Sequence, residues 1–316
     1  MRRVIAAAGL SLGLAADMAT GDGFLWLGSE FQAEGTIFRY NLQTGTIDRV
    51  VSPPRPSGVT HWNNMAIDGS FLYIGSPSSQ YVGVCDLDTG AVLASHTYTP
   101  ALSGHKEDGA YHPGTGNLWR ATFSNLLHEV TPTGQLVRTY TGGGALVGLE
   151  WVGGTLYATN YSNGDIGVLS LNPANNTATF TPVPWAPGGP TISETAALAY
   201  DADSGVLYMT ANRHRLWSVS FSNGMAAATL VADLSTLGYP AGGLIDGMGW
   251  FPLPCPADFN DDGSVTTADV SAFLVAWFAD LANGTLHADF NASGATTTAD
   301  ISAYLTAWFQ ALAGGC

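Results

Sequence analysis

The chain has 316 residues, room for two ordinary domains or for one large β domain with a small partner. Only 11% of the residues are charged, against roughly 25% in typical soluble domains, and Lys106 is the one lysine. A formal net charge of −15 excludes binding to nucleic acid or to an anionic membrane surface, because both need clustered basic residues. The 46% hydrophobic content excludes global disorder, and the 39 glycines and 16 prolines favour an all-β chain over a helical bundle.

Residues 1–16 have the layout of a secretory signal peptide. Arg2 and Arg3 precede the apolar run VIAAAGLSLGLAA, and small residues follow before Asp17. The alternative is a first strand or helix of the core. Nothing later in the chain reaches the roughly 18 apolar residues that span a bilayer. We therefore predict a secreted protein, extracellular or associated with a cell surface, with no transmembrane segment.

Residues 17–253 contain one unit five times. Its aromatic strand reads FLWLGS at 24, FLYIGS at 71, NLWRAT at 117, TLYATN at 155 and VLYMTA at 206, with the aromatic residues 47, 46, 38 and 51 positions apart. A second strand, a polar turn ending in Gly such as LDTG, and a third strand follow, and a further apolar run precedes the aromatic strand. Four short strands in about 40–50 residues predict a mainly β fold, a β-propeller.

We expect five blades, with six as the alternative. The last run, GGLIDGMGWFP at 242–252, matches only the first strand of the unit. It is expected to join the N-terminal strands and to close the ring between the two ends of the propeller.

The runs LDTGAVLAS and LNPANNTATF resemble the secreted propellers with YVTN-type or quinoprotein-like repeats. This resemblance covers roughly residues 17–253 and implies an architecture only, because propellers carry many unrelated functions. The stretch around Glu150, LVGLEWVGGTLYATNY, resembles part of the secreted glutaminyl cyclases, which are five-bladed propellers. The rest of that family's pattern is not evident.

Few residues of the propeller segment are catalytic candidates. His105, Lys106, Glu107 and Asp108 are consecutive and His112 is near, a combination that can hold a metal or act as an acid–base pair. The spacing fits no established ligand motif, so we predict a solvated loop on the propeller rim.

Other residues of this segment have structural interpretations as well. His61, Trp62 and Trp185 lie in segments between blades, where aromatic side chains can stack on sugars or anchor the loops. Cys85, within YVGVCDL, is predicted to be a buried small hydrophobe. The catalytic residues, if any, stay unknown.

The C-terminal segment, 254–316, contains two copies of one motif at an offset of 31 residues, without gaps. Each copy has the spacing of a calcium loop, with oxygen ligands at positions 1, 3 and 5, Gly at 6, a backbone carbonyl at 7 and a carboxylate at 12. The predicted ligands are Asp258, Asn260, Asp262, Ser264 and Asp269 in loop one, and Asp289, Asn291, Ser293, Ala295 and Asp300 in loop two. We predict two calcium ions, bound more weakly in loop two because it has two carboxylates instead of three.

An amphipathic helix is predicted after each loop. The apolar positions of the two helices are Val270, Phe273, Leu274 and Trp277, and Ile301, Tyr304, Leu305 and Trp308. About 60 residues form a small core that needs further ties. Besides calcium, we predict a disulfide between Cys255 and Cys316, which bracket the segment and would pair in an oxidising compartment.

This segment resembles a dockerin, of the GC type (type I-like) that ends in Gly-Cys, as Gly315-Cys316 does. The resemblance implies a non-catalytic, EF-hand-like anchoring module that binds a cohesin-like receptor on a scaffold or cell surface. It places the partner-binding residues at loop positions 10 and 11, which are Thr267 and Ala268 and then Thr298 and Ala299. The family often has a hydroxyl pair there, so the two alanines leave the receptor's identity open.

The preferred function is therefore a secreted, non-catalytic binding propeller, anchored through a calcium-dependent dockerin and recognising a carbohydrate or a protein. It is preferred because no acid–base pair has a readable spacing. The alternative is a dockerin-borne enzyme that acts on polysaccharide or peptide: a hydrolase, a lyase or a glutaminyl-cyclase-like enzyme. A third interpretation is self-association into a surface layer.

Overall fold

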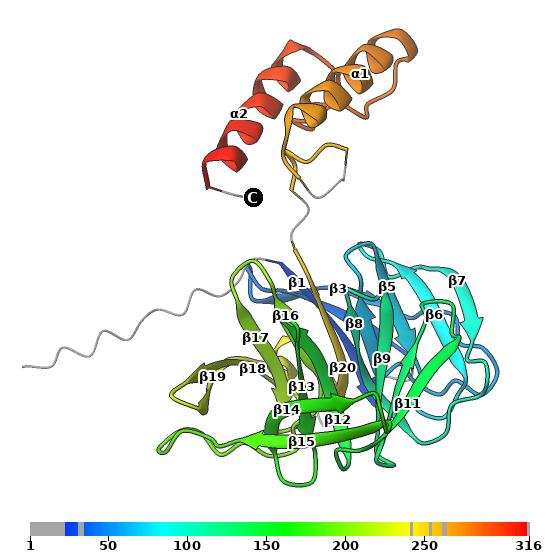
Figure 1. Ribbon diagram of the computed structural model, residues 1–316. Helices are drawn as coiled ribbons and strands as arrows, with labels where there is room; N and C mark the ends of the chain where they lie inside the picture. The colour runs from blue at the N-terminus through cyan, green and yellow to red at the C-terminus, as the bar shows by residue number, and fades with distance from the viewer. Residues whose placement is uncertain (1–22, 31–34, 241–242, 253–254, 261–263, 315–316) are drawn as a thin grey trace, which may run out of the picture.

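The computed structural model describes residues 23–30, 35–240, 243–252, 255–260 and 264–314. The predicted signal peptide, Asp262 and Cys316 lie outside the described residues. The described chain consists of β-strands followed by two α-helices, so the fold is mainly β with a helical C-terminal part (Figure 1). In the described residues, neither helix combines the length and the apolar character that crossing a membrane requires.

The strands form antiparallel sheets in which chain neighbours pair. One sheet has the order β20 (Leu244–Phe251), β1 (Phe24–Glu30), β2 (Ile37–Asn41), β3 (Thr46–Val51). The second contains β4 (Asn64–Ile67), β5 (Phe71–Gly75), β6 (Tyr81–Asp86) and β7 (Val92–Thr97). A third contains β16 (Leu198–Asp201), β17 (Val206–Ala211), β18 (Arg215–Ser222) and β19 (Met225–Asp233), after which a short 3₁₀ helix, η1 (Leu234–Leu237), follows.

An eight-stranded sheet consists of two further runs of four strands. They are β8 (Lys106–His112), β9 (Asn117–Thr122), β10 (Leu126–Val130) and β11 (Leu136–Gly142), then β12 (Leu146–Val152), β13 (Thr155–Asn160), β14 (Asp165–Asn172) and β15 (Thr177–Val183). Only a two-residue parallel contact joins them, where Thr141 and Gly142 of β11 meet Thr177 and Ala178 of β15. Each run is otherwise a four-stranded unit like the other three sheets.

The first strand of each four-stranded unit lies at the centre of the molecule. β20 contacts β4, β4 contacts β8, β8 contacts β12, β12 contacts β16, and β16 contacts β20 again. This closed circuit of inner strands, with the sheets directed outwards, makes the fold propeller-like (Figure 1). β20 pairs with β1 along its length, so the predicted closure by the run at 242–252 is confirmed.

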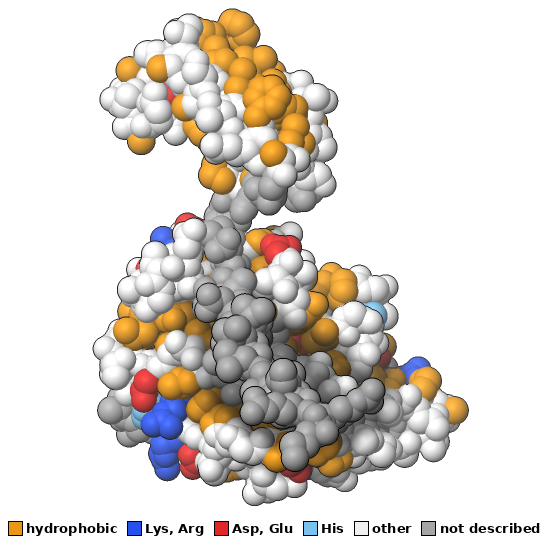
Figure 2. All heavy atoms as spheres, turned by 90° about the vertical axis from the view of Figure 1, so that its left-hand side faces the viewer, with side chains coloured by type: hydrophobic (Ala, Val, Ile, Leu, Met, Phe, Trp, Pro, Cys, Tyr) orange, Lys and Arg blue, Asp and Glu red, His pale blue; other side chains and the backbone are white. Residues whose placement is uncertain are grey.

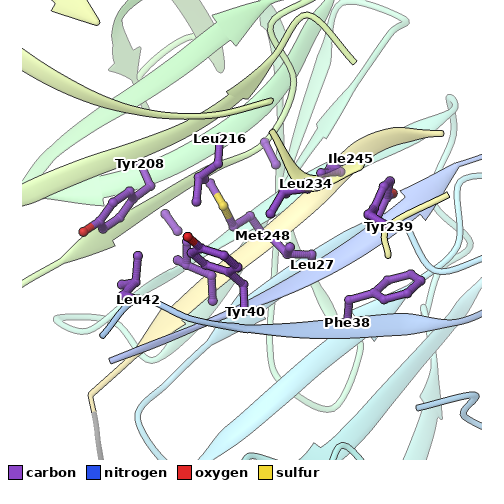
Figure 3. Close-up of a cluster of buried hydrophobic side chains, with 13 residues drawn as sticks. Leu27, Phe38, Tyr40, Leu42, Tyr208, Leu216, Leu234, Tyr239, Ile245 and Met248 are labelled. Carbon is purple, nitrogen blue, oxygen red and sulfur yellow. The ribbon is translucent and has the colours of Figure 1, made fainter. Parts of the chain in front are cut away.

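The repeated aromatic strands are the second strands of the units, as predicted, and their side chains pack between sheets. Figure 3 shows one such core, in which Leu27 and Tyr40 of the first sheet meet Tyr208 and Leu216 of its neighbour around Met248 of β20. Trp26 is fully buried, and its indole N–H donates to the carbonyl of Leu87 at 2.8 Å, which ties two consecutive sheets together.

The C-terminal helices α1 (Thr267–Asn283) and α2 (Thr298–Gly314) share the small core that the sequence predicts. The rings of Phe273 and Tyr304 stack at 4.2 Å between centroids. The two halves also exchange equivalent hydrogen bonds, because Trp277 Nε1 donates to the Thr297 carbonyl and Trp308 Nε1 to the Thr266 carbonyl, each at 2.8 Å. The sequence repeat is thus an approximate two-fold repeat in space.

Candidate functional site

The segment from His105 to Asp108 is not the solvated loop that the sequence predicts. Lys106, Glu107 and Asp108 belong to β8, an innermost strand, and each is at most 1% exposed. The prediction was wrong because these polar residues have tertiary partners that no local pattern reveals. His112 lies at the opposite end of β8, where its ring packs edge-on against Trp151. The predicted cluster is therefore divided between the two ends of one inner strand.

Three inner strands carry a β-bulge at the same level. In β8 the pairing with β9 shifts between Lys106 and Gly109, and in β12 the pairing with β13 shifts between Leu146 and Leu149. In β20 the pairing with β1 passes from Gly247 to Ile245 and leaves out Asp246. Bulges often occur beside functional sites because the extra residue points a side chain in a new direction. Here the extra residues include Glu107, Val147 and Asp246.

These bulges surround a pocket at the N-terminal ends of the inner strands. The pocket has a volume of about 510 Å³, within the range typical of small-ligand sites. Its described lining residues are His61, Ser78, His105, Glu107, Phe123, Val147, Tyr161, Leu244 and Asp246. Phe123 and Tyr161 pack edge to face at 5.8 Å, so an aromatic pair stands beside the carboxylates. The pocket thus combines hydrogen-bonding groups with an apolar surface.

A histidine and a carboxylate are coupled in this pocket. His105 Nδ1 lies 2.5 Å from Glu107 Oε1, with the histidine side chain 42% exposed and the carboxylate 2% exposed. Asn63, which directly precedes β4, donates from Nδ2 to Glu107 Oε2 at 3.1 Å. Both carboxylate oxygens are therefore held from within the protein, and the histidine is the more exposed of these two lining residues.

Buried polar atoms without a partner in the described chain lie around the start of β4 and directly after β5. Asn63 Oδ1, both amide atoms of Asn64 and Ser76 Oγ are buried and have no hydrogen-bond partner within the described chain. Buried polar groups are costly unless they are hydrogen-bonded, so these atoms are expected to bind water.

Two more carboxyl groups lie deeper in the central channel. Asp108 accepts hydrogen bonds from the backbone N–H groups of Leu198 at 3.1 Å and Met248 at 3.2 Å, and thus links β8 to β16 and β20. Burial raises the pKa of Asp108 well above its ordinary value, and the charge of Glu150 adds to this effect. Burial likewise raises the pKa of Glu150 to about 8, although its backbone donors oppose the change. Neither group is among the described residues that line the pocket.

The other sequence candidates have different positions. Trp62 is fully buried and packs against Tyr81, so it is a core residue, whereas its neighbour His61 lines the pocket. Trp185 is half-buried and anchors its loop by donating to the Gly164 carbonyl at 3.1 Å. Cys85 is fully buried, as predicted, and burial raises the pKa of its thiol to about 12.

Sequence reasoning missed Asp246 and the role of Glu107. An alignment of the inner strands was the available signal, because LVGLEW, KEDGAY and LIDGMGW align around a central glycine. Val147, Asp108 and Asp246 directly precede that glycine in their strands, so the alignment indicates Asp246 but gives no signal for Glu107.

The predicted calcium loops are wound around their first and last carboxylates. Asp289 accepts from the backbone N–H groups of Ser293 at 2.9 Å and Gly294 at 2.7 Å. Asp300, fully buried, accepts from the Asn291 N–H at 3.1 Å and the Thr297 N–H at 2.7 Å. Asp269 in loop one repeats these bonds with Asn260 and Thr266. Burial alone would raise the pKa of Asp269 and Asp300, but these donors lower it, which favours ionised carboxylates.

The donors of both loops fit a hard cation such as calcium, because all the predicted ligand atoms are oxygens. Among the described residues, no group of three or more His, Cys, Asp or Glu side chains is placed to hold a metal ion. Loop two has only two carboxylates, and Asp262 of loop one lies outside the described residues. The calcium ligands therefore stay a prediction.

The predicted partner-binding residues begin the two helices and are exposed: Thr267 and Ala268 in α1, Thr298 and Ala299 in α2. Figure 2 shows hydrophobic side chains gathered on the helical part, at the top of the view. The exposed ones include Phe278 and Phe309, at 64% and 62%, which are equivalent in the repeat. Cys316 lies outside the described residues, so the disulfide with Cys255 stays a prediction.

No family model matches the chain, and no curated protein does. Among solved structures, Myxococcus xanthus glutaminyl cyclase is similar with a TM-score of 0.45 and 18% identity, covering 62% of this chain and 84% of that one. A chain of a nidogen/laminin complex reaches 0.46 at 14% identity, with 72% and 97% covered. The β-propeller domain of Myceliophteria thermophila Cps50 (Swd1) reaches 0.40 at 11%, with 65% and 82% covered. At these TM-scores, none of the likenesses bears on function.

Proposed function

We propose that this protein is a secreted binding protein that holds a small hydroxylated molecule, of the size of a mono- or disaccharide, in its central pocket. The observation that carries the proposal is the bulge of β20 that directs the Asp246 carboxylate into a pocket of about 510 Å³. Carboxylates are strong acceptors for hydroxyl groups, and Phe123 and Tyr161 offer a surface for the apolar face of a sugar ring.

We propose that the architecture around this pocket is a five-bladed propeller. This count is supported by the circuit of inner strands β20, β4, β8, β12 and β16, which closes on itself within the described residues. The pocket lies at the first residues of β20, whereas the C-terminal segment follows its last residue. An eight-residue strand spans about 26 Å, which separates the pocket from the segment that we propose as the anchor.

The anchor is proposed to be a dockerin that holds two calcium ions and binds a cohesin-like receptor outside the cell. The side chains of Asp289 and Asn291, with Asp300 at position 12, would hold the ion in loop two, and Asp258, Asn260 and Asp269 would do so in loop one with Asp262. Bound calcium would neutralise the carboxylates and join each loop to its helix. The exposed residues at the starts of α1 and α2 would contact the receptor.

The pocket is tested by isothermal titration of the full chain with a panel of neutral mono- and disaccharides. We expect binding of at least one sugar, and loss of that binding in Asp246→Asn, which keeps the shape and removes the charge. Asp165→Asn, on the half-buried edge of β14, is the matched control and is expected to bind like the wild type. Absence of binding across the panel would overturn the proposed ligand class.

The anchor is tested by titrating the full chain with calcium chloride. We expect two binding events, the weaker of which disappears in Asp289→Ala. No uptake of calcium, with the helices intact by circular dichroism, would contradict the dockerin assignment.

A further inference from the structure

The pocket holds the parts of a nucleophilic hydrolase: a serine, a histidine and a buried carboxylate. Ser78 and His105 both line it, with Glu107 behind the histidine. They come from two segments that the backbone joins, because the N–H of Lys106 donates to the carbonyl of Pro77 at 3.1 Å. That hydrogen bond brings the neighbours Ser78 and His105 to the same region of the pocket wall.

The contact with Glu107 favours one nitrogen of His105 as the base. Glu107, when ionised, is an acceptor only, so the 2.5 Å contact makes His105 Nδ1 the donor. The lone pair of the neutral imidazole then lies on Nε2. Asn63, by donating to the second oxygen of Glu107, fixes the carboxylate in its plane. A buried acid that orients an exposed histidine is the arrangement that activates serine hydroxyls in hydrolases.

We propose that Ser78, His105 and Glu107 form a catalytic unit that hydrolyses short acyl esters of hydroxylated molecules. This inference rests on the proposed ligand site and adds turnover to it. His105 Nε2 takes the Ser78 proton while Oγ bonds to the acyl carbon, and the ester C–O bond then breaks as the imidazolium returns the proton to the leaving alcohol. Water, deprotonated by the same nitrogen, then attacks the acyl carbon; the bond from that carbon to Oγ breaks, the carboxylic acid leaves, and the imidazolium returns the proton to Ser78 Oγ.

The other pocket residues match the two halves of such a substrate. Val147 and Leu244 offer an apolar surface for a short acyl chain. Asp246 and Tyr161 offer acceptors for the hydroxyl groups of the alcohol. No lysine or arginine is among the described lining residues, which favours a neutral ester over an anionic substrate.

The first experiment labels the full chain with a fluorophosphonate probe and identifies the modified residue by mass spectrometry. We expect modification of Ser78, lost in Ser78→Ala and reduced at least about 100-fold in rate in His105→Ala. Ser79→Ala is the matched control and should be labelled like the wild type, because Ser79 only accepts a hydrogen bond from the Tyr81 N–H. Label at another residue, or no label on folded protein, would overturn the proposal.

The second experiment measures hydrolysis of p-nitrophenyl acetate and of acetylated glucose. We expect Glu107→Gln to lower kcat about 100-fold or more with little change in KM, because the carboxylate orients the base without touching substrate. A variant that merely unfolds is recognised by its circular dichroism, and Asn63→Ala then serves as the milder change, with a smaller fall in kcat. Sugar binding without labelling or turnover would refute this inference and leave the binding function intact.

Discussion

The clearest quantitative prediction concerns Glu150, a half-buried carboxyl group in the central channel. Burial raises its pKa from 4.5 to about 8, so the folded chain keeps a proton that the unfolded chain releases. The unfolded state therefore binds fewer protons between these two values, and stability falls as pH rises from about 4.5 to about 8. At about 1.4 kcal/mol per pKa unit, the loss is at most about 5 kcal/mol, and solvent screening reduces it to about 2–3 kcal/mol.

Glu150→Gln removes the ionisation and keeps the shape of the side chain. We expect this variant to lose much of the decline in stability with pH, and to be more stable than the wild type at pH 8 by about 2–3 kcal/mol. Some decline should remain, because the pKa of Asp108 is raised in the same direction.

The assay is urea unfolding of the full chain at pH 5 and pH 8, followed by circular dichroism of the β-sheets. Asp165→Asn is the control, since this residue lies on β14 away from the channel. The reasoning is refuted if Glu150→Gln and the wild type lose the same free energy of unfolding between the two pH values.

Three further predictions concern the thiol and the helical part. Cys85 is buried, and its pKa is raised to about 12. We therefore expect its thiol to react with a disulfide reagent only after the chain unfolds. Reaction in the native chain would contradict its burial. Trp277→Phe and Trp308→Phe should each lower the free energy of unfolding of the helical part by about 1 kcal/mol, because they break equivalent hydrogen bonds. Calorimetry measures this change, and clearly unequal effects would count against the two-fold repeat. Chelation of calcium should lower the melting temperature of the helical part. Asp258→Ala should lower this temperature more than Asp289→Ala, since loop one has more carboxylates. A melting temperature that chelator leaves unchanged would contradict the predicted metal sites.

Local periodicity made the outer strands and both helices predictable. The aromatic strands recur with their turns, and the apolar positions of α1 and α2 that the sequence indicates are those that pack together. In these elements, the side chains that decide the structure are neighbours along the chain, so a single sequence contains the information.

The inner strand β8 was not predictable in this way. Its start, KED, has the composition of a solvated turn, yet it lies in the centre of the molecule. Asp108 is compatible with burial because the N–H groups of Leu198 and Met248, 90 and 140 residues further along the chain, donate to it. Glu107 has a partner in Asn63, 44 residues earlier. Such partners exist only once the ring has closed, so a local pattern cannot indicate them.

The position of the pocket follows from how closely the inner strands approach one another below it. A side chain at Gly148 would lie 2.0 Å from the Ala196 carbonyl oxygen, and one at Gly247 would lie 2.6 Å from the Asn63 carbonyl oxygen. Glycine is therefore required at these two positions for the channel to close. The residues immediately before them, Val147 and Asp246, are displaced by the bulges into the wider space above. Close packing at these glycines thus lies directly beside the bulged residues, so neighbouring positions of one strand serve strand packing and the pocket lining.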